Sequence, residues 1–533
     1  MIPSPMLLLR PAPLILCLCL SLGLGPAAAQ EGETASPTMA EIEQAWQKDD
    51  FIFVRKGLQA LAEETGTALA QYRYGRVLIE GRGGPKDLPG AVLWLTKSAE
   101  QNHIEALTLL ARIYLSNIPQ SQDIPTELKR DPVQAAELLS RAAALGHPDA
   151  QYYLAMLYGS GDGVAQDDTA AFNWMLAAAG QEYVEAQYEL SRIYSRGIGT
   201  ELNTPEALRW LERAASNNHV KAQYFLAAAY ESGNGVDQNM KQAIDWYRRA
   251  AENGLPIAQR NLGTHYLQGE AVTQNVEEGL RWLNAAAKAG DSGAMGNLAM
   301  AYATGLGVAQ DDKTAAQWYD RASEYGLGRA KVALAHFYEV GRGVEPDMDH
   351  AITLYEQALE TNDASQAAFR LGQLAAEGTL EGRVAPQRAV PWAAYAAKTG
   401  DAPSEAWLTT QAEAGMREAQ SALAALYLDS DEHAAKGTGW LQKAAQAGAP
   451  QAQTQLGEMH MTGTHVDLDY VAAHKWFNIA ATLGATKAVE LRETVSALMT
   501  PEDVAAAQAA ARHWFEQEEP RPPETPQSVT VAQ

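Results

Sequence analysis

The sequence is nearly devoid of cysteine. Among its 533 residues only Cys17 and Cys19 are cysteines, and both lie close to the N-terminus. The rest of the chain therefore cannot form a disulfide, a thiolate nucleophile or a cysteine-ligated metal site. Histidine is also scarce, with 11 residues spread thinly along the chain.

Basic residues are in the minority as well. The chain has 41 lysines and arginines against 65 aspartates and glutamates, and no long basic run interrupts it. This balance argues against a nucleic-acid partner, because phosphates are neutralised by lysine and arginine. It argues equally against an anionic membrane surface and favours a basic protein partner or plain solubility.

The N-terminus has the composition of a secretory signal. Arg10 is followed by an apolar stretch at 14–24, and small residues end at Ala29. We predict a signal peptide at 1–29, cleaved after Ala29, and a periplasmic or secreted protein. The alternative is a membrane anchor, but the apolar stretch is shorter than the roughly 20 residues that span a bilayer. No second membrane segment follows, so we expect no stable membrane insertion after cleavage.

An internal repeat of 36 residues dominates the rest of the chain. Alanine, leucine, tyrosine and tryptophan each recur at this spacing; the positions are Ala150, Ala186, Ala222, Ala258, Ala294 and Ala330; Leu154, Leu190, Leu226, Leu262, Leu298 and Leu334; Tyr158, Tyr194, Tyr230, Tyr266, Tyr302 and Tyr338; and Trp174, Trp210, Trp246, Trp282 and Trp318. A repeat this strict predicts a solenoid, in which each unit needs its neighbours to bury its apolar face.

Each unit is predicted to be two helices. In the first, Ala150, Leu154 and Tyr158 fall on one stripe. The second carries Trp174 among alanines, and we expect the tryptophan to fill the gap between helices.

The loop between the helices, 158–168, invites a ligand-binding interpretation. Its glycines could cradle a phosphate and its acidic residues could hold calcium. However, the first glycine recurs in all six units between 150 and 347, and the acidic position of these units is as often asparagine as aspartate. A helix C-cap requires glycine and an N-cap accepts either Asp or Asn, whereas calcium favours charge. We therefore predict a C-cap followed by an N-cap.

The repeated residues resemble the Sel-1-like repeat. The stretches beginning at Ala228 and Ala333 follow its pattern closely, and the resemblance covers roughly residues 70 to 484. It implies an all-α, right-handed superhelical solenoid of the tetratricopeptide-like class, with about ten to eleven two-helix repeats. Members of this family are mostly binding scaffolds. A cysteine-rich secreted branch is linked to β-lactam hydrolysis, but this chain lacks those cysteines.

The predicted organisation has regular and irregular parts. The expected segments are the signal peptide (1–29), a linker (30–37), N-terminal capping helices (38–69), regular repeats (70–365), an irregular repeat and break (366–417), further repeats (418–484), C-terminal capping helices (485–517) and a disordered tail (518–533). One unit has an insertion at 115–131. At the break, two segments resemble second helices with no proper first helix between them.

No catalytic or cofactor motif emerges. His460, His465 and His474 form the only histidine cluster, and their spacing matches no standard metal site. The acidic pairs lie at predicted turns and caps instead of an apolar pocket. We predict no enzyme activity, no cofactor and no metal.

A binding surface is expected on the first helices, which line the concave side of such a solenoid. The stripe beside the core stripe carries tyrosine, arginine and methionine, residue types common as interface anchors. The predicted partner-binding residues are Tyr72, Arg76, Tyr152, Met156, Tyr188, Arg192, Tyr224, Arg260 and His336. An alternative is that these tyrosines only pack between units.

The sequence thus predicts an exported scaffold that binds another protein, in cell-envelope assembly, signalling or host contact. The insertion at 115–131 and the break near Trp392 are alternative binding sites. A cell-wall binding module or hydrolase is the alternative function.

Overall fold

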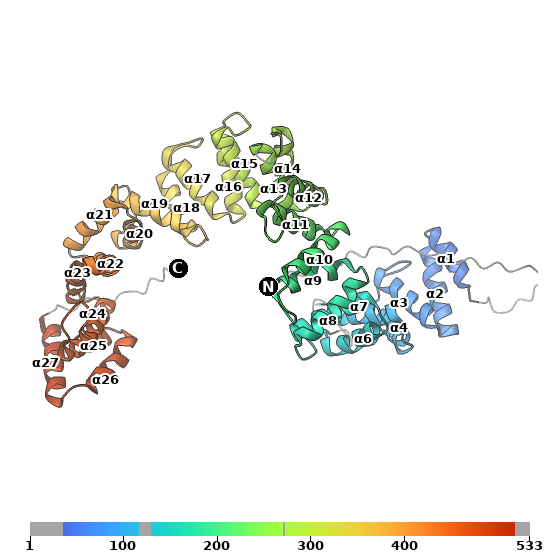
Figure 1. The fold of residues 1–533 in the computed structure, drawn as a ribbon, viewed down its shortest axis with the longest axis horizontal. Helices are drawn as coiled ribbons and strands as arrows, with labels where there is room; N and C mark the ends of the chain where they lie inside the picture. Colours follow the sequence, from blue (N-terminus) through green and yellow to red (C-terminus); the bar gives the residue numbers. More distant parts are fainter. Residues whose placement is uncertain (1–35, 117–128, 270–271, 518–533) are drawn as a thin grey trace, which may run out of the picture. The chain divides into compact units, whose positions relative to one another are not determined.

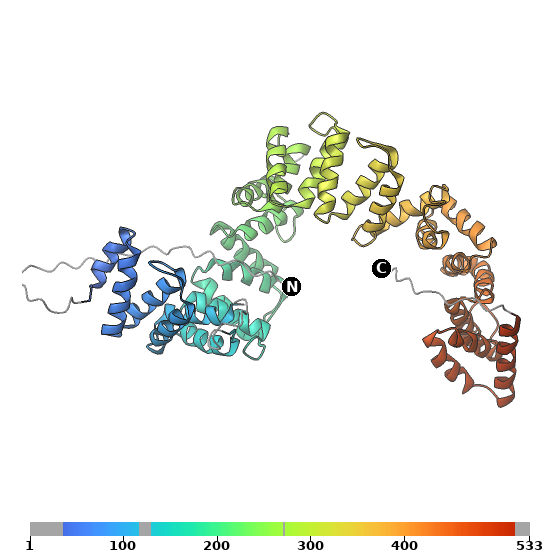
Figure 2. The same ribbon diagram turned by 180° about the vertical axis from the view of Figure 1, so that it is seen from behind.

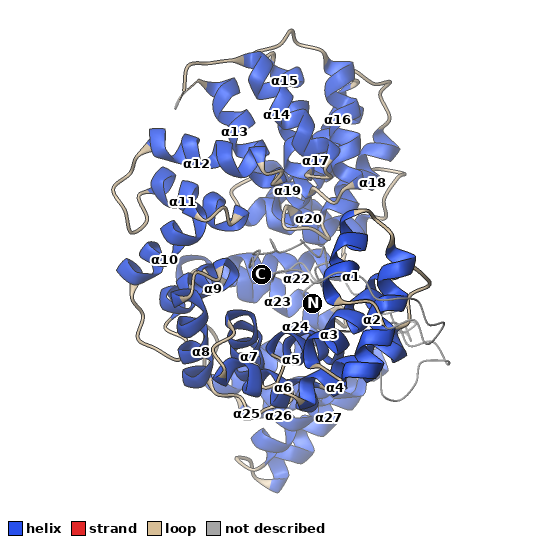
Figure 3. Cartoon of the chain, turned by 90° about the vertical axis from the view of Figure 1, so that its right-hand side faces the viewer, coloured by secondary structure: helices blue, strands red, loops and turns tan. Residues whose placement is uncertain are grey.

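The computed structural model describes residues 36–116, 129–269 and 272–517. Every regular element in these ranges is a helix, and none is a strand (Figure 3). No described helix is long and apolar enough to cross a membrane. The predicted signal peptide, most of the insertion at 115–131, Ala271 and the C-terminal tail lie outside the described residues.

The helices follow one another as hairpins in chain order (Figures 1 and 2). The first helices of the hairpins are α3 (Ala68–Glu80), α5 (Ile104–Leu115), α7 (Pro148–Ser160), α9 (Val184–Arg196), α11 (Val220–Ser232), α13 (Pro256–Gln268), α15 (Ser292–Thr304), α17 (Gly328–Val340), α19 (Ala364–Ala376), α22 (Arg417–Leu428) and α24 (Pro450–Thr462). The second helices are α4 (Leu88–Glu100), α6 (Pro132–Ala144), α8 (Asp168–Gly180), α10 (Thr204–Ser216), α12 (Met240–Glu252), α14 (Val276–Lys288), α16 (Asp312–Glu324), α18 (Met348–Ala358), α20 (Pro386–Lys398), α23 (Ala434–Gln446) and α25 (Tyr470–Thr482).

The chain forms two compact units. One comprises the residues up to Ala186 together with 197–201, and the other comprises 187–196 together with the residues from Leu202 onward. Their boundary passes through α9. Each unit is a run of stacked hairpins, as the repeat predicts.

The core of each unit is built on the repeated alanine and leucine. All twelve of these positions between Ala150 and Leu334 are at most 1% exposed. Alanine allows the helix backbones to approach closely, and each repeat supplies only a small apolar surface, so the stacked neighbours complete the core.

The expectation for tryptophan needs a correction. Trp246 and Trp282 are only partly buried, whereas the residues that follow them, Tyr247 and Leu283, are 1% and 0% exposed. The indoles lie at the edge of the core, where a cation covers them. Trp246, for example, lies 4.4 Å from the Arg249 guanidinium, one turn further along α12.

The loop prediction is confirmed. Gly161 ends α7 in the left-handed conformation at φ 69°, and the side chain of Asp167 accepts a hydrogen bond from the amide of Ala170 at 2.9 Å. Gly163 also has a positive φ, and its α-carbon faces the backbone of Pro132 in the preceding hairpin so closely that a side chain would overlap it. The loop is therefore a pair of caps and a contact between repeats.

Four further helices lie at the ends. Two, α1 (Met39–Gln47) and α2 (Phe51–Thr65), precede the repeats, and two, α26 (Thr486–Ser496) and α27 (Pro501–Gln517), follow them. Thr500 caps the last helix, because its hydroxyl accepts from the amide of Asp503 at 3.2 Å and donates to the Asp503 carboxylate at 2.9 Å. α27 packs against α25, and thereby covers the last repeat.

The break in phase has a simple structural basis. A single helix, α21 (Ala402–Glu413), follows α20 where a hairpin is expected, and it contacts α19, α20 and α22. The loop after α22 is also replaced, by a short 3₁₀ helix, η2 (Asp431–His433). An unpaired helix shifts the register of every later repeat.

Candidate functional site

The predicted stripe on the first helices ties each repeat to the next. Tyr188 stacks on His219, with ring centroids 4.3 Å apart, and His219 is the N-cap residue of the next first helix, α11. The same position and spacing give the Tyr72–His103 stack at 4.8 Å. Arg260 uses an ion pair instead, reaching the N-cap Asp291 at 3.0 Å.

Two further tyrosines of the stripe are also engaged by neighbours. Tyr152 packs on Tyr183 of the next N-cap position, with centroids 5.2 Å apart. Tyr224 packs against Phe225 at 5.2 Å and Tyr247 at 5.8 Å. Tyr72, Tyr152 and Tyr188 are therefore inter-repeat contacts, whereas Tyr224 contacts residues of its own repeat.

Tyr188 requires a correction. We expected its side chain to lie outside the core, but it is only 8% exposed and belongs to a cluster with Ala222 and Leu226. The reason is the N-cap histidine of α11, which covers one face of the ring. Arg192, one turn along α9, stays half-exposed and pairs with Glu189 at 2.7 Å.

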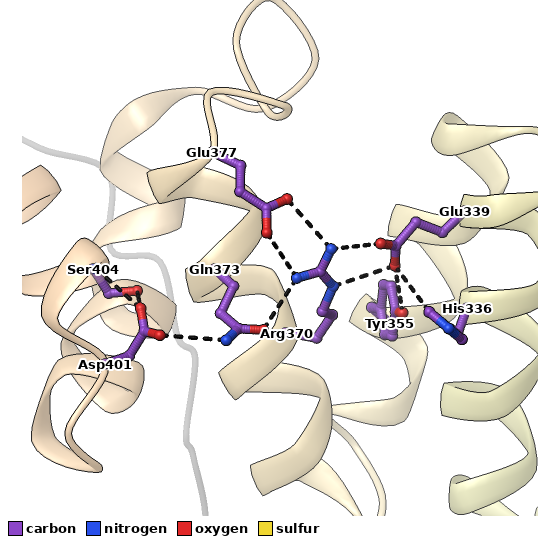
Figure 4. Close-up of polar contacts among 8 residues, drawn as sticks. All are labelled: His336, Glu339, Tyr355, Arg370, Gln373, Glu377, Asp401 and Ser404. Atoms are coloured by element: carbon purple, nitrogen blue, oxygen red, sulfur yellow. Dashed lines mark hydrogen bonds and ion pairs between the residues drawn. The ribbon is translucent and has the colours of Figure 1, made fainter.

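The remaining predicted residues lie at the surface. Arg76 pairs with Glu80 at 3.0 Å, and Met156 is 45% exposed. His336 is exposed on α17, at the margin of a polar network that joins α17, α18 and α19 (Figure 4).

That network centres on the buried Glu339. Arg370 pairs with it from α19, and the Tyr355 hydroxyl donates to it at 2.8 Å. Burial opposes the charge, but the hydrogen bonds from Arg370 and Tyr355 hold the pKa of Glu339 below its usual value. Arg370 also pairs with Glu377 at 2.9 Å. Because its members satisfy one another, the network is structural.

A hollow of about 570 Å³ opens on the first-helix face of the second unit. We use this name, the first-helix face, for the surface formed by the first helices. Its lining comes from α11, α13, α15 and α17 with one adjoining residue: Glu231, Arg260, Asn261, Thr264, His265, Gln268, Ser292, Gly293, Asn297, Leu327 and Arg329. Of the nine predicted residues, only Arg260 lines it.

Two glycines of α15 lie beside this hollow, where Arg260 crosses Gly293 and Leu327 packs over Gly296. Gly296 occupies the position that holds Tyr188 in α9 and Tyr224 in α11, and Gly293 lies one turn before it on the same face. Neither glycine has a positive φ, so both are there for space and not for backbone conformation. A side chain at Gly293 would overlap Arg260, and one at Gly296 would lie 2.7 Å from Leu327.

The charged groups of the hollow differ in their partners. Glu231 pairs with His265 at 3.1 Å and accepts from Tyr247. Burial, and then this hydrogen bond, raise the pKa of Tyr247. Among the described residues, Arg329 is exposed and has no ion pair or hydrogen bond. The hollow therefore has one free cation in a chain of strongly negative net charge.

Buried glutamines are a second feature that our sequence analysis missed. Gln223, directly after the core Ala222, donates to the carbonyl of Ala215 at 3.2 Å and accepts from Asn253 at 3.1 Å. It thus ties α11 to the helices on both sides. The signal was available, because glutamine follows the repeated alanine at 151, 187, 223 and 259.

The histidine cluster does not assemble a metal site. No group of three metal-binding side chains exists within the described ranges. His465 faces Asp431 at 3.8 Å and His460 contacts the Asp467 carbonyl at 3.3 Å. His474 is 2% exposed, and burial lowers its pKa.

The Sel1 repeat profile matches eleven segments, which together cover more than half of the chain: 68–103, 125–147, 148–183, 184–219, 220–255, 256–291, 292–327, 328–363, 365–401, 417–448 and 450–484. The chain belongs to the Sel1 repeat family. The unmatched interval at 402–416 of this Sel1 repeat protein contains the single helix α21.

Solved structures agree with this assignment. The crystal structure of c5321, a protective antigen present in uropathogenic Escherichia coli strains and displaying an SLR fold, is 27% identical, with a TM-score of 0.56; the match covers 91% of this chain and 99% of that one. A Sel1 repeat protein from Oxalobacter formigenes is 29% identical over 66% of this chain and 98% of its own, with a TM-score of 0.47. The comparison with curated proteins found no match.

Sel1 repeat solenoids are generally non-catalytic scaffolds for protein–protein interaction. In this chain the first-helix face offers such a scaffold one hollow with an unpaired arginine.

Proposed function

We propose that this Sel1 repeat protein is exported to the periplasm or beyond and binds another protein through its first-helix face, which forms the concave side in this proposal. The observation that carries the proposal is the hollow lined by Gly293, Arg260 and Arg329. Tyr72, Tyr152 and Tyr188 of the same face contact the next repeat, whereas this hollow opens to the surface.

Two observations support export and an envelope or host-contact role. The first 29 residues have the pattern of a signal peptide. The E. coli structure that this chain resembles along 91% of its length is that of a protective antigen present in uropathogenic strains. Sequencing the N-terminus of the protein purified from the periplasm should find Gln30 first.

Affinity purification from an envelope extract tests the binding function. Met300 lies on α15 and is 44% exposed, and Leu202, in the loop before α10, is 65% exposed. We expect the wild-type chain and the Leu202→Glu control to retain a stoichiometric protein, and Met300→Glu to lose it, because a charge on the face opposes apolar contact. Equal retention by both variants would contradict binding at this face. Retention on peptidoglycan without any protein would instead favour a cell-wall binding module.

A further inference from the structure

We infer that the hollow binds a carboxylate group of an extended peptide, presented by an aspartate or glutamate side chain or by the peptide's C-terminus. This inference rests on the proposed protein-binding function and adds the chemistry of the partner. It depends on how Arg260 and Arg329 lie over α15.

Both arginines approach the same turn of α15 from opposite neighbours. Arg260 extends from α13 across Gly293. A side chain at Gly293 would overlap the Nη1 atom of Arg260. Arg329 comes from α17, and its Nε and Nη2 atoms lie 4.0 Å from the position that a β-carbon of Gly296 would take. Since residues three apart on a helix share a face, the two guanidinium groups flank one open turn.

Hydrogen-bond donors remain free on both groups. Arg260 reaches both oxygens of Asp291 through Nη1 alone, at 3.0 and 3.1 Å. Its Nε and Nη2, and every nitrogen of Arg329, have no hydrogen bond to the part of the chain that the structure describes. A guanidinium presents donors in a planar fork that matches a carboxylate, and this pairing is stronger than a neutral hydrogen bond.

The acidic groups of the hollow already have partners. Asp291 is paired with Arg260, and Glu231 lies 3.1 Å from His265 and accepts a hydrogen bond from Tyr247. Among the described residues Arg329 has no carboxylate partner, so its charge is available to an incoming anion.

The rest of the lining fits a peptide better than a glycan. Asn261 and Asn297 carry amide groups with donors and acceptors like those of a peptide backbone, and Thr264 and Ser292 add hydroxyls. The lining has no phenylalanine, tyrosine or tryptophan on which a sugar ring could stack. The guanidinium of Arg329, together with the free Nε and Nη2 of Arg260, suits the single charge of a carboxylate.

Selection from a random-peptide display library on the immobilised full chain provides the probe. We expect the retained peptides to share an acidic residue or a required free C-terminus. The affinity of one selected peptide is then measured by fluorescence anisotropy for the wild type, Arg329→Ala and Arg209→Ala. Arg209 is the matched control, because it is exposed on the second helix α10 and pairs only with its own helix neighbour Glu206.

Arg329→Ala should weaken binding about tenfold or more, as expected for one charged pair. Replacing the carboxylate of the peptide by the corresponding amide should weaken binding by the same factor. The two changes together should be no worse than either alone, since both remove the same interaction. Arg209→Ala should leave affinity unchanged.

Several outcomes would overturn the inference. Peptides without acidic groups, a preference for phosphorylated peptides, or unchanged affinity of Arg329→Ala would each contradict a carboxylate in this hollow. A partner recovered from the envelope extract would still support the proposed function in those cases. If the extract also yields no protein partner, the proposed function fails with it.

Discussion

Two junctions between successive first helices differ in whether side chains link the two repeats. Between α9 and α11, Tyr188 stacks on His219 and Gln187 accepts a hydrogen bond from Asn217 at 3.0 Å. Between α15 and α17, the equivalent positions hold Gly296 and Met295, and neither side chain can make such a tie. The hollow lies at the second junction.

The difference shows that one position has two alternative uses. A large side chain there reaches the N-cap of the next first helix and holds two repeats together. A glycine gives up that contact, and Leu327 packs over Gly296 instead. Cohesion at α15 and α17 therefore depends on the shared core alone, such as Leu298 and Ala330.

The largest expected effect is the loss of the aromatic tie. Tyr188→Ala should lower the free energy of unfolding of α9 and α11 by about 3 kcal/mol, because it leaves a cavity in a buried site. Native-state hydrogen exchange of these helices measures the change. Arg192→Glu, four residues along the same helix, is the control and should change stability by less than about 0.5 kcal/mol. A Tyr188 variant as stable as the wild type would show that the stack contributes nothing.

A glycine needed for its conformation should behave differently from the glycines of α15. Gly233 ends α11 at φ 73°, so Gly233→Val forces a branched side chain into the left-handed region and should cost about 1–2 kcal/mol. Gly296→Ala, in a helical conformation, should shift the free energy of unfolding by less than about 0.5 kcal/mol, since gained helix propensity offsets the contact with Leu327. Similar losses at both sites in urea unfolding would contradict this distinction.

The glutamine ties allow a gain of stability. The buried Oε1 of Gln259 has no hydrogen-bond partner, and Ala289 stands where Asn253 serves Gln223. Ala289→Asn should supply this hydrogen bond and increase the free energy of unfolding by about 1 kcal/mol. The melting temperature should rise accordingly. The reciprocal change, Asn253→Ala, should lose about as much. A destabilised Ala289→Asn protein would show that the amide does not reach Gln259.

The last effect concerns pH. Burial, and then the charge of Lys221, lower the pKa of His219 to about 4. The unfolded chain binds a proton near the usual pKa of 6.5 and the folded chain does not, so stability should fall as pH decreases from about 6.5 towards 4. His219→Asn supplies a capping oxygen in place of the imidazole Nδ1 and does not titrate in this range, so it should flatten the dependence in thermal melts. An unchanged pH profile would assign the effect to other groups.

The period of the sequence predicts the hairpins, the alanine–leucine core and the loop caps, because each depends on residues within one repeat. The contacts between repeats were harder to predict. Tyr188 lies on the expected side of α9, yet its burial depends on His219, thirty-one positions later. Likewise the position of Arg260 indicated the right face. The role of Arg329 could not be predicted, because the hollow forms only when α13, α15 and α17 pack side by side.

The most direct test of this account is hydrogen–deuterium exchange of the full chain with and without the protein partner recovered from the envelope extract. The account predicts that binding slows exchange in the first helices α13, α15 and α17, around Gly296, and leaves the second helices α14 and α16 unchanged. Protection confined to the second helices, or to the first-helix junction held by Tyr188 and His219, would contradict it.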